Sequence, residues 1–170
     1  WNEFCDWYIE MSKPLLYSKD KKEHEHAVAM LTYTLTQILK LLHPFIPYIT
    51  EEIYSKYAKK GSILMMEDWP SYNKKFAFRK EEKSFEGLRE LVVAIRNLRA
   101  EMGVVPAKKL NAYIKATDEN FMKKSAQYLY KLAGIGNVTF VADKNEITER
   151  CTAIVTHTAE VMIPMGDLVD

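Results

Sequence analysis

Apolar residues recur every three or four positions over the first hundred residues, which is typical of helices with one buried face. This spacing predicts four helices, at about residues 1–17, at about 21–42, from Pro47 onward, and at about 81–102. The third helix is expected to bury Ile49, Ile53 and Tyr57. Residues 61–80 show no sustained period, so we expect an ordered connection that is held by aromatic side chains such as Trp69.

The pattern changes after Pro106, where apolar and polar residues alternate as they do in half-buried strands. A strand is predicted from Leu110, and Asp118 is placed to cap a helix that ends near Leu132. A second strand is expected around Val138–Val141, and the alternating segment Cys151–Pro164 reads as a β-hairpin.

Together these patterns predict a mainly α chain of two parts. Residues 1–104 are expected to form an antiparallel helical bundle, and residues 105–170 a small α+β subdomain with a β-hairpin. Gly103 stands where a left-handed residue would close the fourth helix, at the junction of the two parts.

Composition limits the kinds of partner that the chain can bind. The 170 residues are 48% hydrophobic and carry 24 basic against 23 acidic side chains, so any contact with nucleic acid must be local. Cys5 and Cys151 have no ligand or disulfide spacing, and no apolar run reaches the roughly 20 residues of a membrane span. We therefore expect a cytoplasmic protein with no membrane association.

The common catalytic signatures are missing from the sequence. It contains no phosphate-binding GxxxxGK[ST], no HExxH and no GxSxG motif. The pair His24 and His26 would project about 200° apart on a helix, which does not suit a shared metal ion. We expect no catalytic residue, no metal site and no cofactor within these residues.

One charged residue stands out because of its place in the fourth helix. Arg99 follows Ile95 by four positions and Val92 by seven, so it lies on the apolar stripe, and Arg89 and Arg96 flank that stripe. Guanidinium groups in such a row suit contacts with phosphates or bases. They equally suit a structural role in which the side chains extend around the core and pair with nearby glutamates.

Several segments resemble one family. The stretches LLHPFIPYITEEIY, SILMMEDWP, AIRNLRAEMGVVPAKK and AEVMIPMGDLVD make nearly the whole chain similar to the C-terminal part of the valyl-tRNA synthetases, which are class I enzymes. LHPFxPxxTEE with a later WP is shared with the isoleucyl and leucyl members, whereas AIRNLRAEMGVVPAKK is more like the valyl members. The closing GDLVD departs from the family's GLVD-like ending by an aspartate.

The resemblance implies that residues 1–104 are most of an anticodon-binding domain whose first helix is missing. The family's HIGH and KMSKS signatures, editing domain and coiled-coil arm are not in this sequence. Attachment of valine to tRNA with ATP and Mg²⁺, and editing of mischarged threonyl-tRNA, would then occur in other domains of a parent enzyme. The implied partners are the anticodon arm of tRNA(Val) and those catalytic and editing domains, and the parent is expected to be a monomer.

Five residues are the candidate tRNA contacts on this interpretation. We expect Arg96 and Arg99 to contact the backbone or a base of the anticodon loop, Asn97 a base edge, and Lys108 and Lys109 nearby phosphates. Two alternatives stay open from the sequence. One is the same domain of an isoleucyl- or leucyl-type synthetase, and the other is a helical scaffold that binds a protein through the aromatic face of its first helix.

Overall fold

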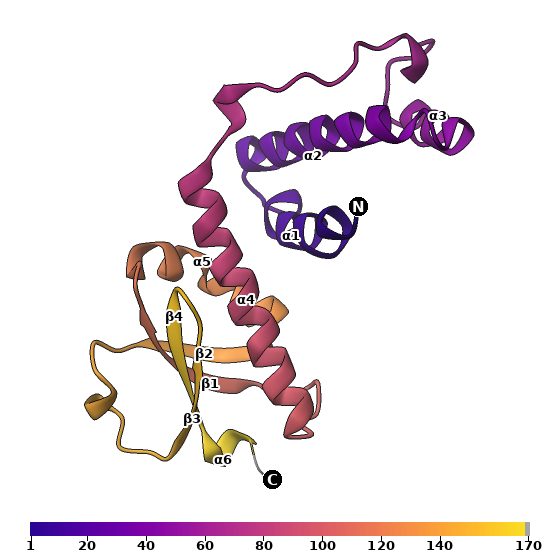
Figure 1. Ribbon diagram of the computed structural model, residues 1–170. Coiled ribbons are helices and arrows are strands. Elements are labelled where there is room, and N and C mark those ends of the chain that lie inside the picture. Colours follow the sequence, from indigo (N-terminus) through magenta and orange to yellow (C-terminus); the bar gives the residue numbers. More distant parts are fainter. Residues whose placement is uncertain (169–170) are drawn as a thin grey trace. The chain divides into compact units, whose positions relative to one another are not determined.

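The computed structural model describes residues 1–168 and forms two compact units, each of which is described by itself (Figure 1). The first unit is Trp1–Lys74, and the second begins at Lys75. This division falls before the long helix that ends near residue 101, whereas the sequence placed the boundary after it. The reason is that the buried face of this helix belongs to the core of the second unit, which includes a sheet. The strands of that sheet are brought together by contacts between residues far apart in the sequence.

The first unit is helical. A wide π-helical segment, Glu3–Ile9, leads into α1 (Glu10–Leu16), and α2 (Lys21–Leu42), α3 (Pro47–Ser55) and a 3-10 turn at Leu64–Met66 follow. The Asp20 carboxylate caps α2 by accepting the backbone N–H groups of Lys22 at 2.8 Å and Glu23 at 3.4 Å. The bounds of α2 are those that the sequence predicts, and Pro47 begins α3 as expected.

The core of the first unit is small. Leu39, Tyr54 and Leu64 form one buried cluster, and Phe4, Met11 and Ala27 are also buried. The expected burial of Ile49 is wrong, because this side chain is 60% exposed. Helix α3 is turned so that Thr50 faces inward instead, where its hydroxyl lies 2.8 Å from Nδ1 of His43 and donates to the backbone carbonyls of Ile46 and Pro47.

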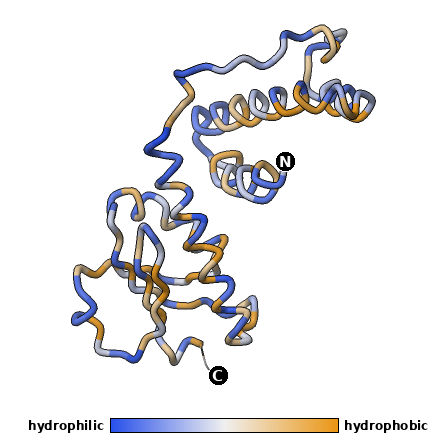
Figure 2. The backbone as a smooth tube through the Cα atoms, in the orientation of Figure 1, coloured by the Kyte–Doolittle hydropathy of each residue, from blue (hydrophilic) through white to orange (hydrophobic). Residues whose placement is uncertain are grey.

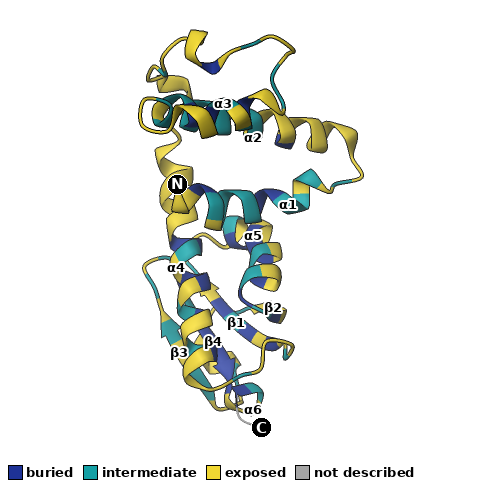
Figure 3. Ribbon diagram, turned by 90° about the vertical axis from the view of Figure 1, so that its right-hand side faces the viewer, coloured by how far each residue is buried: buried dark blue, intermediate teal, exposed yellow. Residues whose placement is uncertain are grey.

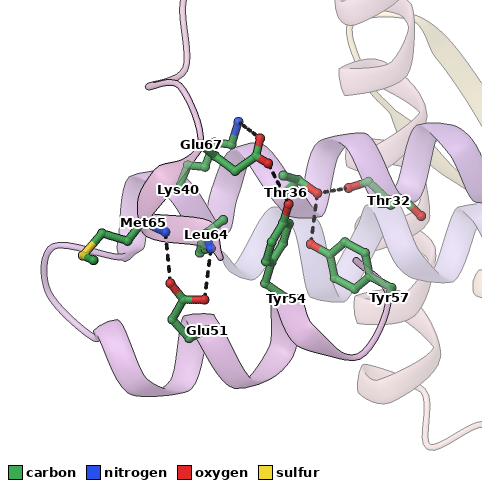
Figure 4. A network of polar contacts seen from close by, with 9 residues as sticks. All are labelled: Thr32, Thr36, Lys40, Glu51, Tyr54, Tyr57, Leu64, Met65 and Glu67. Atoms are coloured by element: carbon green, nitrogen blue, oxygen red, sulfur yellow. Dashed lines mark hydrogen bonds and ion pairs between the residues drawn. The ribbon is translucent and has the colours of Figure 1, made fainter. Parts of the chain in front are cut away.

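Polar groups hold the connection that follows α3 (Figure 4). The two carboxylate oxygens of Glu51 accept the backbone N–H groups of Leu64 and Met65, both at 3.0 Å. The expectation that aromatic side chains pin this segment is wrong, since Trp69 is 61% exposed. Backbone amides in a turn need acceptors, and an acidic side chain of α3 supplies them.

A second set of polar contacts lies beside the first (Figure 4). The Tyr54 hydroxyl donates to Glu67 at 2.9 Å, and the Lys40 ammonium lies 3.2 Å from the other carboxylate oxygen. These two partners hold the pKa of the Glu67 carboxyl below its usual value. Burial and the neighbouring carboxylate raise the pKa of Tyr54.

The second unit combines helices with a mixed sheet. After a 3-10 turn at Lys74–Phe76, its elements are α4 (Arg79–Glu101), β1 (Leu110–Ala116), α5 (Glu119–Leu132), β2 (Ile135–Phe140), a 3-10 turn at Lys144–Glu146, β3 (Cys151–Val155), β4 (Ala159–Pro164) and α6 (Met165–Leu168). The sheet order is β2-β1-β4-β3, with β1 parallel to β2 and the other neighbours antiparallel. The predicted β-hairpin is therefore confirmed, and so is an α-rich chain with an α+β part. Asp118 caps α5 by accepting the Phe121 N–H at 3.0 Å.

The core of the second unit lies between its helices and the sheet. Figure 2 shows that the first turns of α4 are hydrophilic and that apolar positions follow them, while Figure 3 shows β1 and β4 as largely buried. The predicted stripe of α4 is confirmed at its centre, where Val92 and Ile95 are fully buried. Other fully buried side chains come from α4, β1, α5 and β4: Leu88, Leu91, Leu110, Ile114, Leu129, Val161 and Ile163.

Two contacts tie distant segments of the second unit together. The Thr158 side chain, in the turn between β3 and β4, lies directly against Gly87 of α4, where an added Cβ would be 2.3 Å from Thr158 Cγ2. The Asp167 carboxylate accepts the backbone N–H of Asn111 at 2.8 Å and its side-chain amide at 3.0 Å. The aspartate that departs from the family pattern thus joins α6 to β1.

Within residues 1–168, no helix is both long and apolar enough to cross a membrane.

Candidate nucleic-acid interface

The C-terminal end of α4 has the geometry that its glycine predicts. Gly103 has a positive φ of 66°, and its N–H donates to the carbonyl of Ala100 at 3.2 Å. The next N–H, of Val104, reaches back to the carbonyl of Arg99 at 2.9 Å. These two bonds form a Schellman motif, which ends the helix sharply and sends the chain into a short loop, residues 103–109.

Arg99 lies beneath that loop and is buried, with 8% of its surface exposed. Its Nη2 donates to the carbonyls of Val105 at 3.0 Å, Pro106 at 3.4 Å and Lys108 at 3.0 Å, and its Nη1 donates to that of Gly134 at 3.2 Å. The structure thus gives Arg99 a place in the core, and carbonyl oxygens rather than glutamates are its partners.

Gly134 makes room for this guanidinium. It has a positive φ of 69°, and a Cβ at this position would lie 3.0 Å from Arg99 Nη1 and 3.1 Å from Cζ. The Gly134 carbonyl also accepts the backbone N–H of Leu110 at 3.2 Å, at the start of β1. The sequence offers one sign of this close approach, which is the position of Arg99 on the apolar stripe of α4.

Arg96 and Asn97 lie on the exposed side of the same helix end. Arg96 Nε donates to the carbonyl of Leu132, the last residue of α5, at 2.6 Å. This bond satisfies a carbonyl that the end of α5 leaves without a helical partner. Arg89, the third arginine of the row, pairs with Glu86 at 3.1 Å.

The two lysines follow within the loop. The Lys108 N–H donates to the Val105 carbonyl at 3.1 Å, and the Lys108 side chain is half-buried. Lys109 is exposed and lies beside Gly136 of β2. The structure therefore brings all five predicted residues to one end of α4, four of them with side chains that reach the surface and Arg99 buried beneath them.

The first unit carries a different kind of surface, which sequence reasoning did not single out. Phe45 and Tyr48, on either side of the start of α3, are 82% and 90% exposed. On the aromatic face near the N-terminus, Phe4 is buried and stacks on Tyr8 with ring centroids 5.6 Å apart.

Comparison with known families shows which protein family contains this segment. Residues 1–114 match the family described as the anticodon-binding domain of tRNA ligases. The chain belongs to this family. The match includes the first unit, all of α4, the loop 103–109 and most of β1, so the five candidate residues lie within the family's domain.

Relatives of the chain carry the name valine–tRNA ligase. Over its whole length the chain is 40% identical to that of Clostridium acetobutylicum, 41% to that of Clostridium tetani and 35% to that of Streptococcus agalactiae. It covers 20%, 19% and 19% of those three proteins, so it spans about a fifth of the length of these curated relatives. The resemblance inferred from the sequence motifs is confirmed.

Proposed function

We propose that this chain is the part of a valine–tRNA ligase that binds the anticodon arm of tRNA(Val). The observation that carries the proposal is the cluster of Arg96, Asn97, Lys108 and Lys109 around a rigid helix end inside the segment that matches the anticodon-binding family. Relatives at 35–41% identity over the full chain favour the valyl type over the isoleucyl and leucyl types.

The cluster offers chemistry that suits an RNA loop. Exposed ammonium and guanidinium groups bind phosphates, and an amide on a rigid helix can read the edge of an unpaired base. We assign Lys108 and Lys109 to phosphates, Asn97 to a base edge, and Arg96 to the backbone or a base. Because the net charge of the chain is only +1, binding would depend on this local cluster rather than on a broad basic surface.

The remaining activities belong to the parent enzyme in this proposal. Attachment of valine to tRNA with ATP and Mg²⁺, and editing of mischarged tRNA, would take place in domains outside these residues. We further propose that residues 1–104 form the antiparallel helical bundle of a class I anticodon-binding domain, and that the enzyme is a cytoplasmic monomer.

Fluorescence anisotropy with labelled tRNA(Val), repeated over a range of salt concentrations, tests the RNA-binding proposal. Lys108→Gln with Lys109→Gln should weaken binding and reduce the salt dependence of log K by about 1 for each phosphate that is no longer bound. The exposed pair Lys59 and Lys60 provides a matched control, since Lys59→Gln with Lys60→Gln should leave the titration unchanged. Equal losses of affinity for the two pairs, or no binding by the wild-type chain at low salt, would contradict the proposal.

A further inference from the structure

The loop 103–109 has no helix or strand of its own to hold it. Its carbonyls at Val105, Pro106 and Lys108 instead point inward to one guanidinium, that of Arg99. The backbone carbonyl of the same residue accepts the Val104 N–H at 2.9 Å. Arg99 therefore fixes the loop at its beginning through its main chain and along its length through its side chain.

The chemistry of this site calls for arginine. Four carbonyl oxygens, including that of Gly134, converge on one buried group, so that group must supply several hydrogen-bond donors, and a positive charge suits their negative ends. The planar guanidinium offers donors in several directions at once, whereas an ammonium offers a single nitrogen atom. With lysine at this position, the charge would remain but some of the carbonyls would lose their donor.

The lysines that we assign to phosphates lie at the end of this loop. The Lys108 carbonyl is held 3.0 Å from Arg99 Nη2, which fixes the peptide plane between Lys108 and Lys109. A loop already held in one conformation loses less entropy when it binds a ligand. Arg99 can thus raise RNA affinity from beneath the loop without touching the RNA.

We propose that Arg99 is a positioning residue, which presents Lys108 and Lys109 to the phosphates of the RNA and makes no RNA contact itself. This inference rests on the proposed function, and it revises the direct contact expected from the sequence. It also gives Gly134 a role in binding, because a Cβ at its position, where φ is 69°, would lie 3.0 Å from the guanidinium and force it to shift by a few tenths of an ångström.

A double-mutant cycle with labelled tRNA(Val) tests the proposal. Gly134→Ala should displace the guanidinium while leaving its charge in place, and Arg99→Lys should release part of the loop. Each change should weaken RNA binding by about tenfold in the wild-type chain, because the loop is no longer preorganised. In the chain that carries Lys108→Gln and Lys109→Gln, each should weaken it by less than about twofold, because the groups being positioned are gone.

Two further measurements keep the outcome unambiguous. Gly61→Ala is the control for backbone strain, since Gly61 has a φ of 89° with open space around it, and it should leave RNA binding unchanged. Amide hydrogen exchange of residues 104–109 without RNA should become faster in Gly134→Ala, while circular dichroism shows that the chain remains folded.

The cycle separates failure of this inference from failure of the proposed function. If the tenfold loss of affinity persists without the two lysines, Arg99 contacts RNA directly and the positioning role is refuted. If Gly134→Ala and Arg99→Lys lower the melting temperature but leave affinity unchanged, the role of Arg99 is structural only. If replacing the two lysines leaves RNA binding intact, the lysine site itself fails, and the positioning role fails with it.

Discussion

The contact between Gly87 and Thr158 provides a quantitative test of how α4 packs in the second unit. A Cβ added at Gly87 would lie 2.3 Å from Thr158 Cγ2, 2.4 Å from Oγ1 and 2.8 Å from Cβ, so Gly87→Ala forces the turn between β3 and β4 to move. Overpacking of this kind costs about 1 to 3 kcal/mol. Alanine in place of glycine inside a helix otherwise contributes about 1 kcal/mol of stability. We therefore expect a net loss of about 1 kcal/mol.

The sign of the effect should depend on residue 158. In a chain that carries Thr158→Gly, the obstructing side chain is gone, so Gly87→Ala should stabilise the second unit by about 1 kcal/mol through helix propensity alone. Urea denaturation of the four chains in this cycle measures both values. Gly166→Ala is the control, because a Cβ at Gly166 of α6 meets nothing within 4 Å. The same sign in both backgrounds would refute the packing that we describe.

Three other changes have expected outcomes. Glu51→Gln replaces a carboxylate that accepts two backbone N–H groups and should lower the stability of the first unit by about 1 kcal/mol in urea denaturation; no change would show that these bonds are not needed. Tyr54 and Lys40 lower the pKa of the Glu67 carboxyl. The stabilisation that the Glu67 carboxylate provides is therefore fully present above the usual carboxyl pKa, and it is lost as pH falls through the lowered pKa of the folded protein. The acid unfolding curves of the wild type and of Glu67→Gln should converge at low pH. Ile95→Ala removes a fully buried side chain and should cost about 2 to 5 kcal/mol in urea denaturation, and a cost below about 1 kcal/mol would contradict its burial.

Local signals allowed much of the secondary structure to be predicted. The Asp20 cap sets the start of α2, and Pro44 follows its end closely, so both bounds could be placed from the sequence. The alternation after Leu110 gave β1, and the cap at Asp118 gave the start of α5. Gly103 marked the end of α4, since a positive φ at that point favours glycine.

Features that depend on contacts between distant segments could not be predicted in this way. Helical spacing placed Ile49 and Ile53 on one face of α3, but in the structure Thr50 faces inward and bonds to His43, while Ile49 is exposed. The partners of Arg99 are backbone carbonyls, which every residue has, so no side-chain pattern marks them. The candidate site was found because a charge on an apolar stripe is unusual, and its geometry needed the structure.

Recognition of the anticodon arm is the central claim, and a change in the RNA tests it most directly. Anisotropy titrations of the 170-residue chain should compare tRNA(Val) with the same tRNA altered only at the middle base of its anticodon. A single base contact is worth about 1 to 3 kcal/mol, so the altered tRNA should bind roughly 5- to 150-fold more weakly. Equal affinity for the two tRNAs would contradict the account.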